Sequence, residues 1–94
     1  MIYVVAISIV KEEFQDLYQE SLMSLIIPTR KEKGCLLYDL HRNKEDYSHF
    51  IFYEIWDSRS SLNDHAASEH LLAHQERTKE WLISNSVHVL DRIA

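Results

Sequence analysis

The sequence has 94 residues, room for one domain, with a formal net charge of −5, 46% hydrophobic residues and 27% charged residues. This composition is too apolar for a disordered chain, and its acidic balance without basic runs argues against binding to nucleic acid or to an anionic membrane. No apolar stretch approaches the roughly 20 residues of a membrane-spanning helix.

The first predicted element is a strand, because Ile2 to Val10 is rich in Ile and Val and apolar almost throughout. A secretory signal peptide is not expected, since the segment lacks a basic region and a small-residue cleavage site. Apolar residues then recur at helical spacing over residues 14–26, with Glu12 and Glu13 before them as the helix dipole prefers. Pro28 is expected to end or bend this helix, and Gly34 to cap its C-terminus.

Two β-prone segments, Cys35 to Arg42 and His49 to Trp56, predict a hairpin with a loop over residues 43–48. The single cysteine, Cys35, cannot form an internal disulfide, which favours a reducing, cytoplasmic location.

A second helical segment is predicted from Leu62 to Leu82, either continuous or broken near Ser68. Residues 57–61, Asp-Ser-Arg-Ser-Ser, supply candidate N-cap residues for it. Asn85 and Ser86 are expected to end it before a short closing strand over residues 87–93.

The resulting order is β-α-β-β-α-β, the split β-α-β arrangement of ferredoxin-like α+β folds with an antiparallel sheet. The helices would cover one face of the sheet and leave the other without cover inside the chain. Pairing of that face with a second copy would bury it. We therefore predict one domain over residues 1–94 that forms a homodimer.

The hairpin has two faces of different chemistry. If Arg42 pairs with His49, one face is aliphatic with two tyrosines and is predicted to lie under the helices. A carboxylate among aromatic rings is costly on an interior face unless it is paired or hydrated. The second face is therefore either a ligand pocket or the rim of a dimer interface. Its residues are Cys35, Leu37, Asp39, His41, Phe50, Phe52, Glu54 and Trp56.

Motifs along nearly the whole chain resemble the antibiotic biosynthesis monooxygenase domain, a dimeric α+β barrel. The pattern Tyr-Glu-x-Trp followed by x-x-His and Ser-x-His is the more specific part of the resemblance. The motifs are Val4-Val5-Ala6, Pro28-Thr29-Arg30, Gly34 to Leu40, Phe52 to Trp56, and Leu62-Asn63-Asp64-His65 with Ser68 and His70.

The resemblance implies a homodimer with a pocket in each protomer between the sheet and the helices. Many relatives oxidise quinols or polycyclic phenols with molecular oxygen and no metal or flavin. Others degrade haem, isomerise a small phosphorylated ketone, or have no known reaction. Haem breakdown is not expected, because the Asn, Trp and His of that branch correspond here to Val5, His65 and Gln75.

His65 and His70 are the candidate catalytic residues. Imidazole titrates near neutral pH and can accept a phenolic proton, although a histidine can equally cap a helix or bond a carboxylate. Trp56 can wall a pocket or belong to a dimer core, and Glu54 can orient a histidine or hold a structural hydrogen bond. The candidate substrate-binding residues are Asp39, His41, Phe52, Tyr53, Glu54 and Trp56.

No metal or flavin is expected. His70 and His74 share a helix face at a spacing that can hold a metal, but the sequence has no HExxH motif and no ligand cluster. Its single glycine cannot form a phosphate-cradling loop.

The resemblance, together with these candidate residues, implies a cofactor-independent monooxygenase that oxidises a quinol or another electron-rich phenolic compound with O2. One alternative is an isomerase of a small carbonyl metabolite, in which His41 or His65 works with Glu54 or Asp39. The other alternative is a non-catalytic dimeric module for small-molecule binding or stress response.

Overall fold

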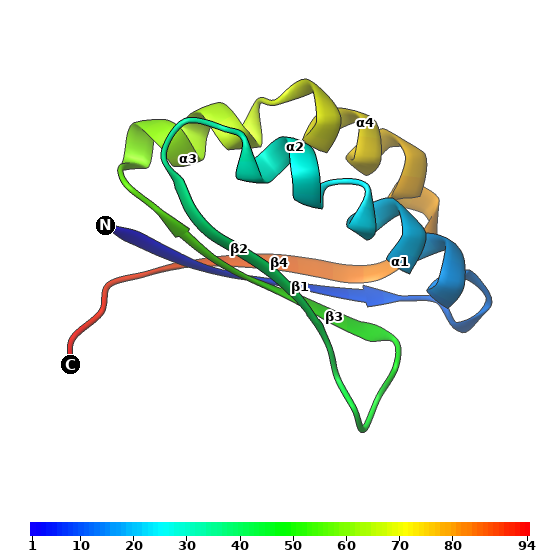
Figure 1. The fold of residues 1–94 in the computed structure, drawn as a ribbon. Helices are drawn as coiled ribbons and strands as arrows, with labels where there is room; N and C mark the ends of the chain where they lie inside the picture. Colours follow the sequence, from blue (N-terminus) through cyan, green and yellow to red (C-terminus); the bar gives the residue numbers. More distant parts are fainter.

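The computed structural model describes residues 1–94 and places every helix on one face of a four-stranded antiparallel sheet (Figure 1). The strands are β1 (Ile2–Val10), β2 (Cys35–Arg42), β3 (His49–Trp56) and β4 (Leu82–Leu90). The helices are α1 (Gln15–Met23), α2 (Ile26–Arg30), α3 (Arg59–Ala66) and α4 (Glu69–Thr78), with 3₁₀ turns at Glu12–Phe14 and Lys79–Trp81.

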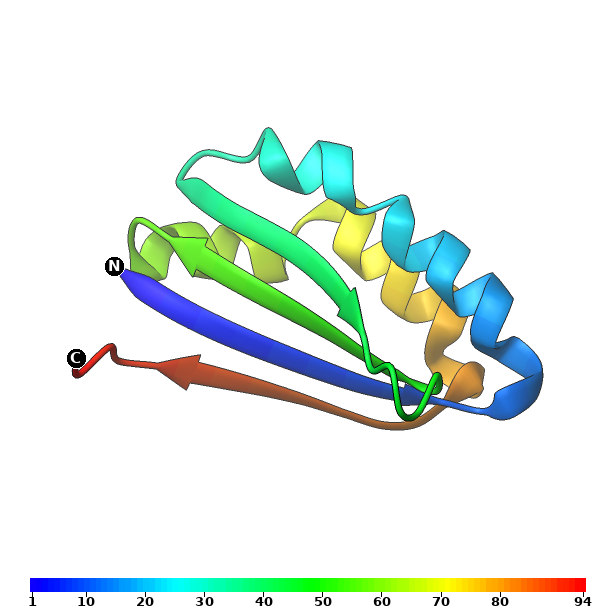
Figure 2. The same ribbon diagram turned by 60° about the horizontal axis from the view of Figure 1, so that its bottom comes forward.

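The strand order is β2-β3-β1-β4, so the first and third strands are central and the other two form the edges (Figure 2). This is a ferredoxin-like α+β fold, as the order of elements in the sequence predicts. The apolar β1 pairs with β3 on one side and with β4 on the other.

The first helical segment differs in detail from the prediction. It is divided at Ser24 and Leu25, and Pro28 lies in the first turn of α2, where its missing N–H removes no helical hydrogen bond. Gly34 does not cap the helix, because α2 ends at Arg30 and its C-cap is Lys31. Gly34 instead adopts φ 84° in the turn before β2, where a Cβ would overlap side-chain atoms of Ser61 and Asp57.

The second helical segment is broken at Ala67 and Ser68, which confirms one of the two predicted forms. Ser58 caps α3, where its hydroxyl accepts a hydrogen bond from the Ser61 N–H at 3.1 Å. The closing strand begins at Leu82, earlier than predicted, so Asn85 and Ser86 lie inside β4. Their pairing with β1 overrides their weak β-propensity.

The register assumed for the hairpin is wrong by one residue, because Arg42 pairs with Phe50. A register shift between Cys35 and Leu37 interrupts the ladder. A one-residue slip exchanges the faces of a strand. In β3 the helix-covered face therefore carries Phe50, Phe52, Glu54 and Trp56, all of them buried.

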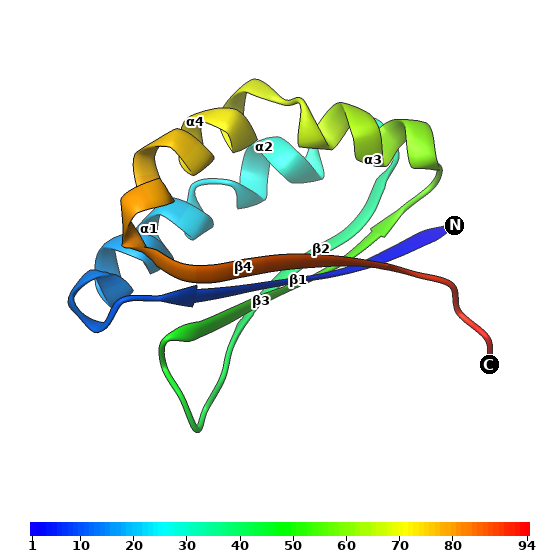
Figure 3. The same ribbon diagram turned by 180° about the vertical axis from the view of Figure 1, so that it is seen from behind.

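The opposite face of the sheet has no helix over it, as the views from both sides show (Figures 1 and 3). Strand alternation places Asp39, His41 and Tyr53 on this face, and 39% of Tyr53 is exposed. The face also carries the partly exposed aliphatic residues Val5, Ile7, Ile9, Ile51 and Ile55. None of the helices is long and apolar enough to cross a membrane.

Candidate active site

A cavity of about 430 Å³ lies between the sheet and the helical layer. Its volume is typical of small-molecule sites, and twelve of its twenty lining residues are hydrophobic. The apolar walls include Tyr18, Leu22, Leu25, Tyr38, Phe52, Leu62 and Leu71.

One buried carboxylate and two buried imidazoles line this cavity: Glu54, His65 and His74 are only 4%, 5% and 5% exposed. Each has one polar atom without a hydrogen-bond partner, namely Oε2 of Glu54 and Nε2 of each histidine. No fully buried side-chain nitrogen or oxygen in the chain lacks a partner. These three atoms are therefore open to the cavity, where a ligand can reach them.

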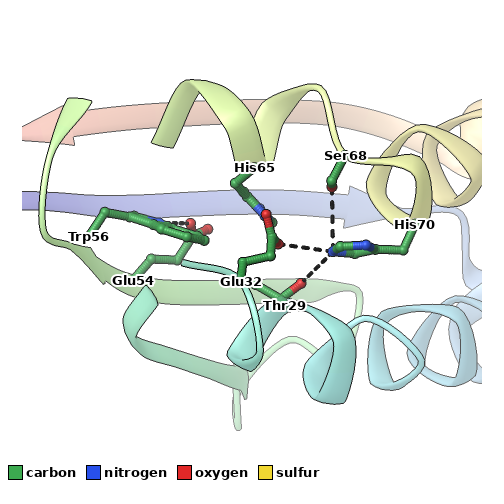
Figure 4. A network of polar contacts seen from close by, with 7 residues as sticks. All are labelled: Thr29, Glu32, Glu54, Trp56, His65, Ser68 and His70. Carbon is green, nitrogen blue, oxygen red and sulfur yellow. Dashed lines mark hydrogen bonds and ion pairs between the residues drawn. The ribbon is translucent and has the colours of Figure 1, made fainter. Parts of the chain in front are cut away.

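His65 is held on its other side by Glu32. Its Nδ1–H donates to Glu32 Oε2 at 2.7 Å, because a carboxylate can only accept (Figure 4). The imidazole also packs against the Trp56 ring at 4.7 Å and edge-on against the Tyr38 ring at 5.5 Å. These contacts fix the ring with the lone pair of Nε2 toward the cavity.

Glu32 lies in the turn between α2 and β2, and its backbone is bonded on both sides. Its N–H donates to Thr29 O at 3.0 Å, and its carbonyl accepts from the Cys35 N–H at 3.2 Å. The Gly34 carbonyl accepts from the Asp57 N–H at 2.9 Å, which draws this turn against the start of α3. The sequence offers no motif for Glu32, so only the fold shows its role.

His70 does not line the cavity but lies behind Glu32. Its Nε2–H donates to the same Glu32 Oε2 at 3.0 Å, with Thr29 Oγ1 at 3.1 Å and Ser68 Oγ at 3.4 Å from that nitrogen (Figure 4). The two candidate catalytic histidines thus share one carboxylate, and only His65 reaches the cavity.

Glu32, His65 and His70 could together hold a metal ion, since one ligand atom of each lies within 4.8 Å of the others. The expectation that the chain has no ligand cluster is therefore wrong. The two contacts of Glu32, 2.7 and 3.0 Å, are hydrogen-bond distances. They are shorter than the roughly 3.3 Å between ligands around tetrahedral zinc, so Glu32 would have to shift for a metal.

The remaining predicted residues divide between the two faces of the sheet. Glu54 and Phe52 line the cavity. Trp56 is fully buried beside it and donates from Nε1 to Glu54 Oε1 at 2.9 Å. Burial raises the pKa of Glu54, opposed in part by this hydrogen bond and by His65. Strand alternation turns the other three predicted binding residues, Asp39, His41 and Tyr53, away from the cavity.

His70 and His74 do not face a common metal position. His70 points to Glu32, whereas Nδ1 of His74 lies 2.8 Å from Ser21 Oγ on α1. The sequence therefore predicts the shared helix of the two histidines but not their different partners.

Residues 1–77 match the family model described as antibiotic biosynthesis monooxygenase. "Uncharacterized protein sll1783" of Synechocystis is 31% identical over 72 residues, which cover 77% of this chain and 46% of that protein. "Putative monooxygenase Rv0793" of Mycobacterium tuberculosis is 36% identical over 61 residues, which cover 65% of this chain and 59% of that protein. The chain spans about half the length of these curated relatives.

Solved structures match over the whole chain. A crystal structure of an antibiotic biosynthesis monooxygenase is 30% identical with a TM-score of 0.94, and the match covers 100% of both chains. The structure of Rv0793 is 28% identical with a TM-score of 0.92, and the match covers 99% of this chain and 95% of that one. The chain belongs to the antibiotic biosynthesis monooxygenase family.

Proposed function

We propose that the protein is a monooxygenase that oxidises a quinol or another electron-rich phenolic compound with O2 and without a cofactor. The observation that carries the proposal is the free Nε2 of His65, open to a largely apolar cavity and aimed there by Glu32. A base in such a cavity can remove a phenolic proton at neutral pH. The family membership supports the same class of reaction.

The proposed reaction begins when His65 Nε2 takes the proton of the substrate hydroxyl. The phenolate passes one electron to O2, and the two radicals combine to form a carbon–oxygen bond. Cleavage of the O–O bond then leaves one oxygen atom on the ring as a carbonyl. The second oxygen atom leaves as water. Its two hydrogens come from the substrate, one from the C–H at the oxidised carbon and one from the hydroxyl. The substrate itself therefore supplies all the electrons that reduce O2.

The neighbours of His65 have supporting roles in this proposal. Glu32 holds the imidazole and stabilises it when it becomes positively charged, and His70 orients Glu32 from behind. Phe52 and Tyr38, stacked with ring centroids 4.4 Å apart, form an aromatic wall for the substrate ring.

An isomerase of a small carbonyl metabolite is the second candidate. It is favoured by Glu54, whose pKa is raised by burial and which lines the same cavity as His65. A carboxyl and an imidazole that face one cavity can serve as the acid and base that an enol intermediate needs.

Oxygen uptake with a panel of quinols and phenols tests the proposal. We expect consumption of one O2 per molecule of substrate oxidised, in protein dialysed against a chelator and free of flavin absorbance. Loss of activity on dialysis, with recovery on adding back a metal, would instead assign the Glu32, His65 and His70 cluster to that metal. If no panel member is consumed, the monooxygenase proposal fails, and carbonyl isomerisation is the next activity to measure.

We also propose that the protein works as a homodimer joined through the open face of the sheet. That face is uncovered and rich in aliphatic side chains, whose burial is favourable. We expect sedimentation at micromolar concentration to show a species of twice the 11.2 kDa chain mass.

The replacement Ile7→Glu is expected to shift this equilibrium to the monomer, because it places a charge at the centre of the open face opposite Ile51. The matched control is Ile27→Glu, at a residue that is 67% exposed on the helical layer. A wild-type protein that sediments only as an 11.2 kDa species would overturn the dimer proposal.

A further inference from the structure

We propose that His74 is a ligand-binding group of the cavity, a neutral imidazole that donates a hydrogen bond from Nε2 to an acceptor oxygen of the substrate. The ligand would then be an aromatic compound with two oxygen functions, a hydroxyl facing His65 and a carbonyl facing His74. The inference rests on the proposed function only in assigning the cavity to ligand binding, and not on the chemistry with oxygen.

The hydrogen bonds around Ser21 determine which nitrogen of His74 carries the proton. Arg77 donates to Ser21 Oγ from Nε at 3.0 Å and from Nη2 at 2.7 Å. A guanidinium cannot accept, so these two bonds occupy both lone pairs of the hydroxyl. The Ser21 hydroxyl hydrogen must therefore go to His74 Nδ1, 2.8 Å away. Because Nδ1 accepts, the proton of a neutral His74 ring is on Nε2.

The ring is neutral under ordinary conditions. Burial and the neighbouring Arg77 guanidinium lower the pKa of His74 to about 4. His74 is therefore a fixed hydrogen-bond donor above that pH and does not act as a base toward the ligand.

Nε2 of His74 is the atom that faces the ligand. It has no partner in the protein, yet no fully buried polar side-chain atom is left unsatisfied, so it opens into the cavity that the residue lines. A donor that faces a largely apolar cavity favours ligands that present an acceptor there and penalises those that do not.

The two histidines are complementary and lie toward different ends of the cavity. His65 packs on Trp56, whereas His74 lies against Tyr18, which in turn packs on Phe50. Roughly 20 Å of extended strand separates Phe50 from Trp56. One end thus offers an acceptor and the other a donor, which selects both the kind of ligand and its direction in the cavity.

Binding of a matched pair of ligands tests the inference. The pair is 6-acetyl-2-naphthol and 6-ethyl-2-naphthol, which share the hydroxyl and differ in one carbonyl oxygen. By calorimetry we expect the wild-type protein to bind the acetyl compound about tenfold more tightly. This is the gain in affinity that one additional hydrogen bond provides. In His74→Phe, which keeps an aromatic ring beside Tyr18, this ratio should fall to about one.

Two further variants test whether the preference for the acetyl compound depends on the tautomer of His74 and not on His65. Ser21→Ala removes the hydroxyl that fixes the tautomer, and we expect it to reduce the preference. His65→Phe should weaken both ligands equally and leave the ratio unchanged, because both carry the same hydroxyl. That control also separates this inference from the proposed role of His65.

Nitrogen NMR of the wild-type imidazole gives a readout that needs no variant. We expect His74 to show a protonated Nε2 and an unprotonated Nδ1 at neutral pH. The reverse tautomer, a ratio unchanged in His74→Phe, or a wild-type protein that binds both ligands equally or neither would each overturn the proposal.

Discussion

Replacing His65 with alanine is expected to lower turnover of a quinol substrate by about 10²- to 10⁴-fold, with little change in KM. The imidazole acts as the proton leaves the substrate hydroxyl and negative charge develops on its oxygen, so it stabilises the transition state more than the bound substrate. Initial rates of oxygen uptake over a range of substrate concentrations measure the two parameters separately.

The pH dependence of the wild-type protein gives an independent check. Activity should show an acid limb, because a protonated imidazole cannot accept a proton. This limb should be absent from the residual activity of His65→Ala. The matched control is His70→Ala, which leaves Nε2 of His65 in place and is expected to have the smaller effect. Full turnover in His65→Ala would move the base to another group, with Glu54 the first to test.

The sequence predicts the order of helices and strands because each of them is determined largely by its own local residue pattern. The Ile- and Val-rich first strand, the helical spacing before Ser24 and the break at Ser68 all depend on neighbours in the chain. His65, Glu54 and Phe52 could likewise be chosen from a short motif, and the fold brings all three to one cavity.

The register of the hairpin could not be predicted in the same way. A loop over residues 43–48 is too long to fix which residues pair, and the irregularity between Cys35 and Leu37 has no sequence signal. The consequence for the site is large, because a slip of one residue decides whether Glu54 or Tyr53 faces the helices. Burial of the ring side chains against the helices decides it in favour of Glu54.

The hydrogen-bond partners of His65 and His74 could not be predicted from the sequence either. Glu32 reaches His65 from a polar turn, and Ser21 reaches His74 from another helix. Both contacts join residues far apart in the chain, and neither partner carries a motif of its own. The sequence thus indicates which residues can react, whereas the tertiary contacts decide which atom of each ring faces the ligand.

Replacing Glu32 with glutamine is expected to lower turnover by roughly 10- to 10³-fold, less than the loss in His65→Ala, and to leave KM little changed. The amide can still accept from Nδ1 of His65 but carries no charge to stabilise the imidazolium that forms during the reaction.

The decisive measurement is the double variant. Glu32 acts through His65, so His65→Ala/Glu32→Gln should turn over no more slowly than His65→Ala alone. The matched control is Glu76→Gln, an exposed carboxylate paired with Lys79, which should change neither rate nor pH profile. If the effects of the two site variants multiply, Glu32 contributes independently of the base. Its shared position between His65 and His70 would then point to a direct role, for which metal binding at that cluster is the first test.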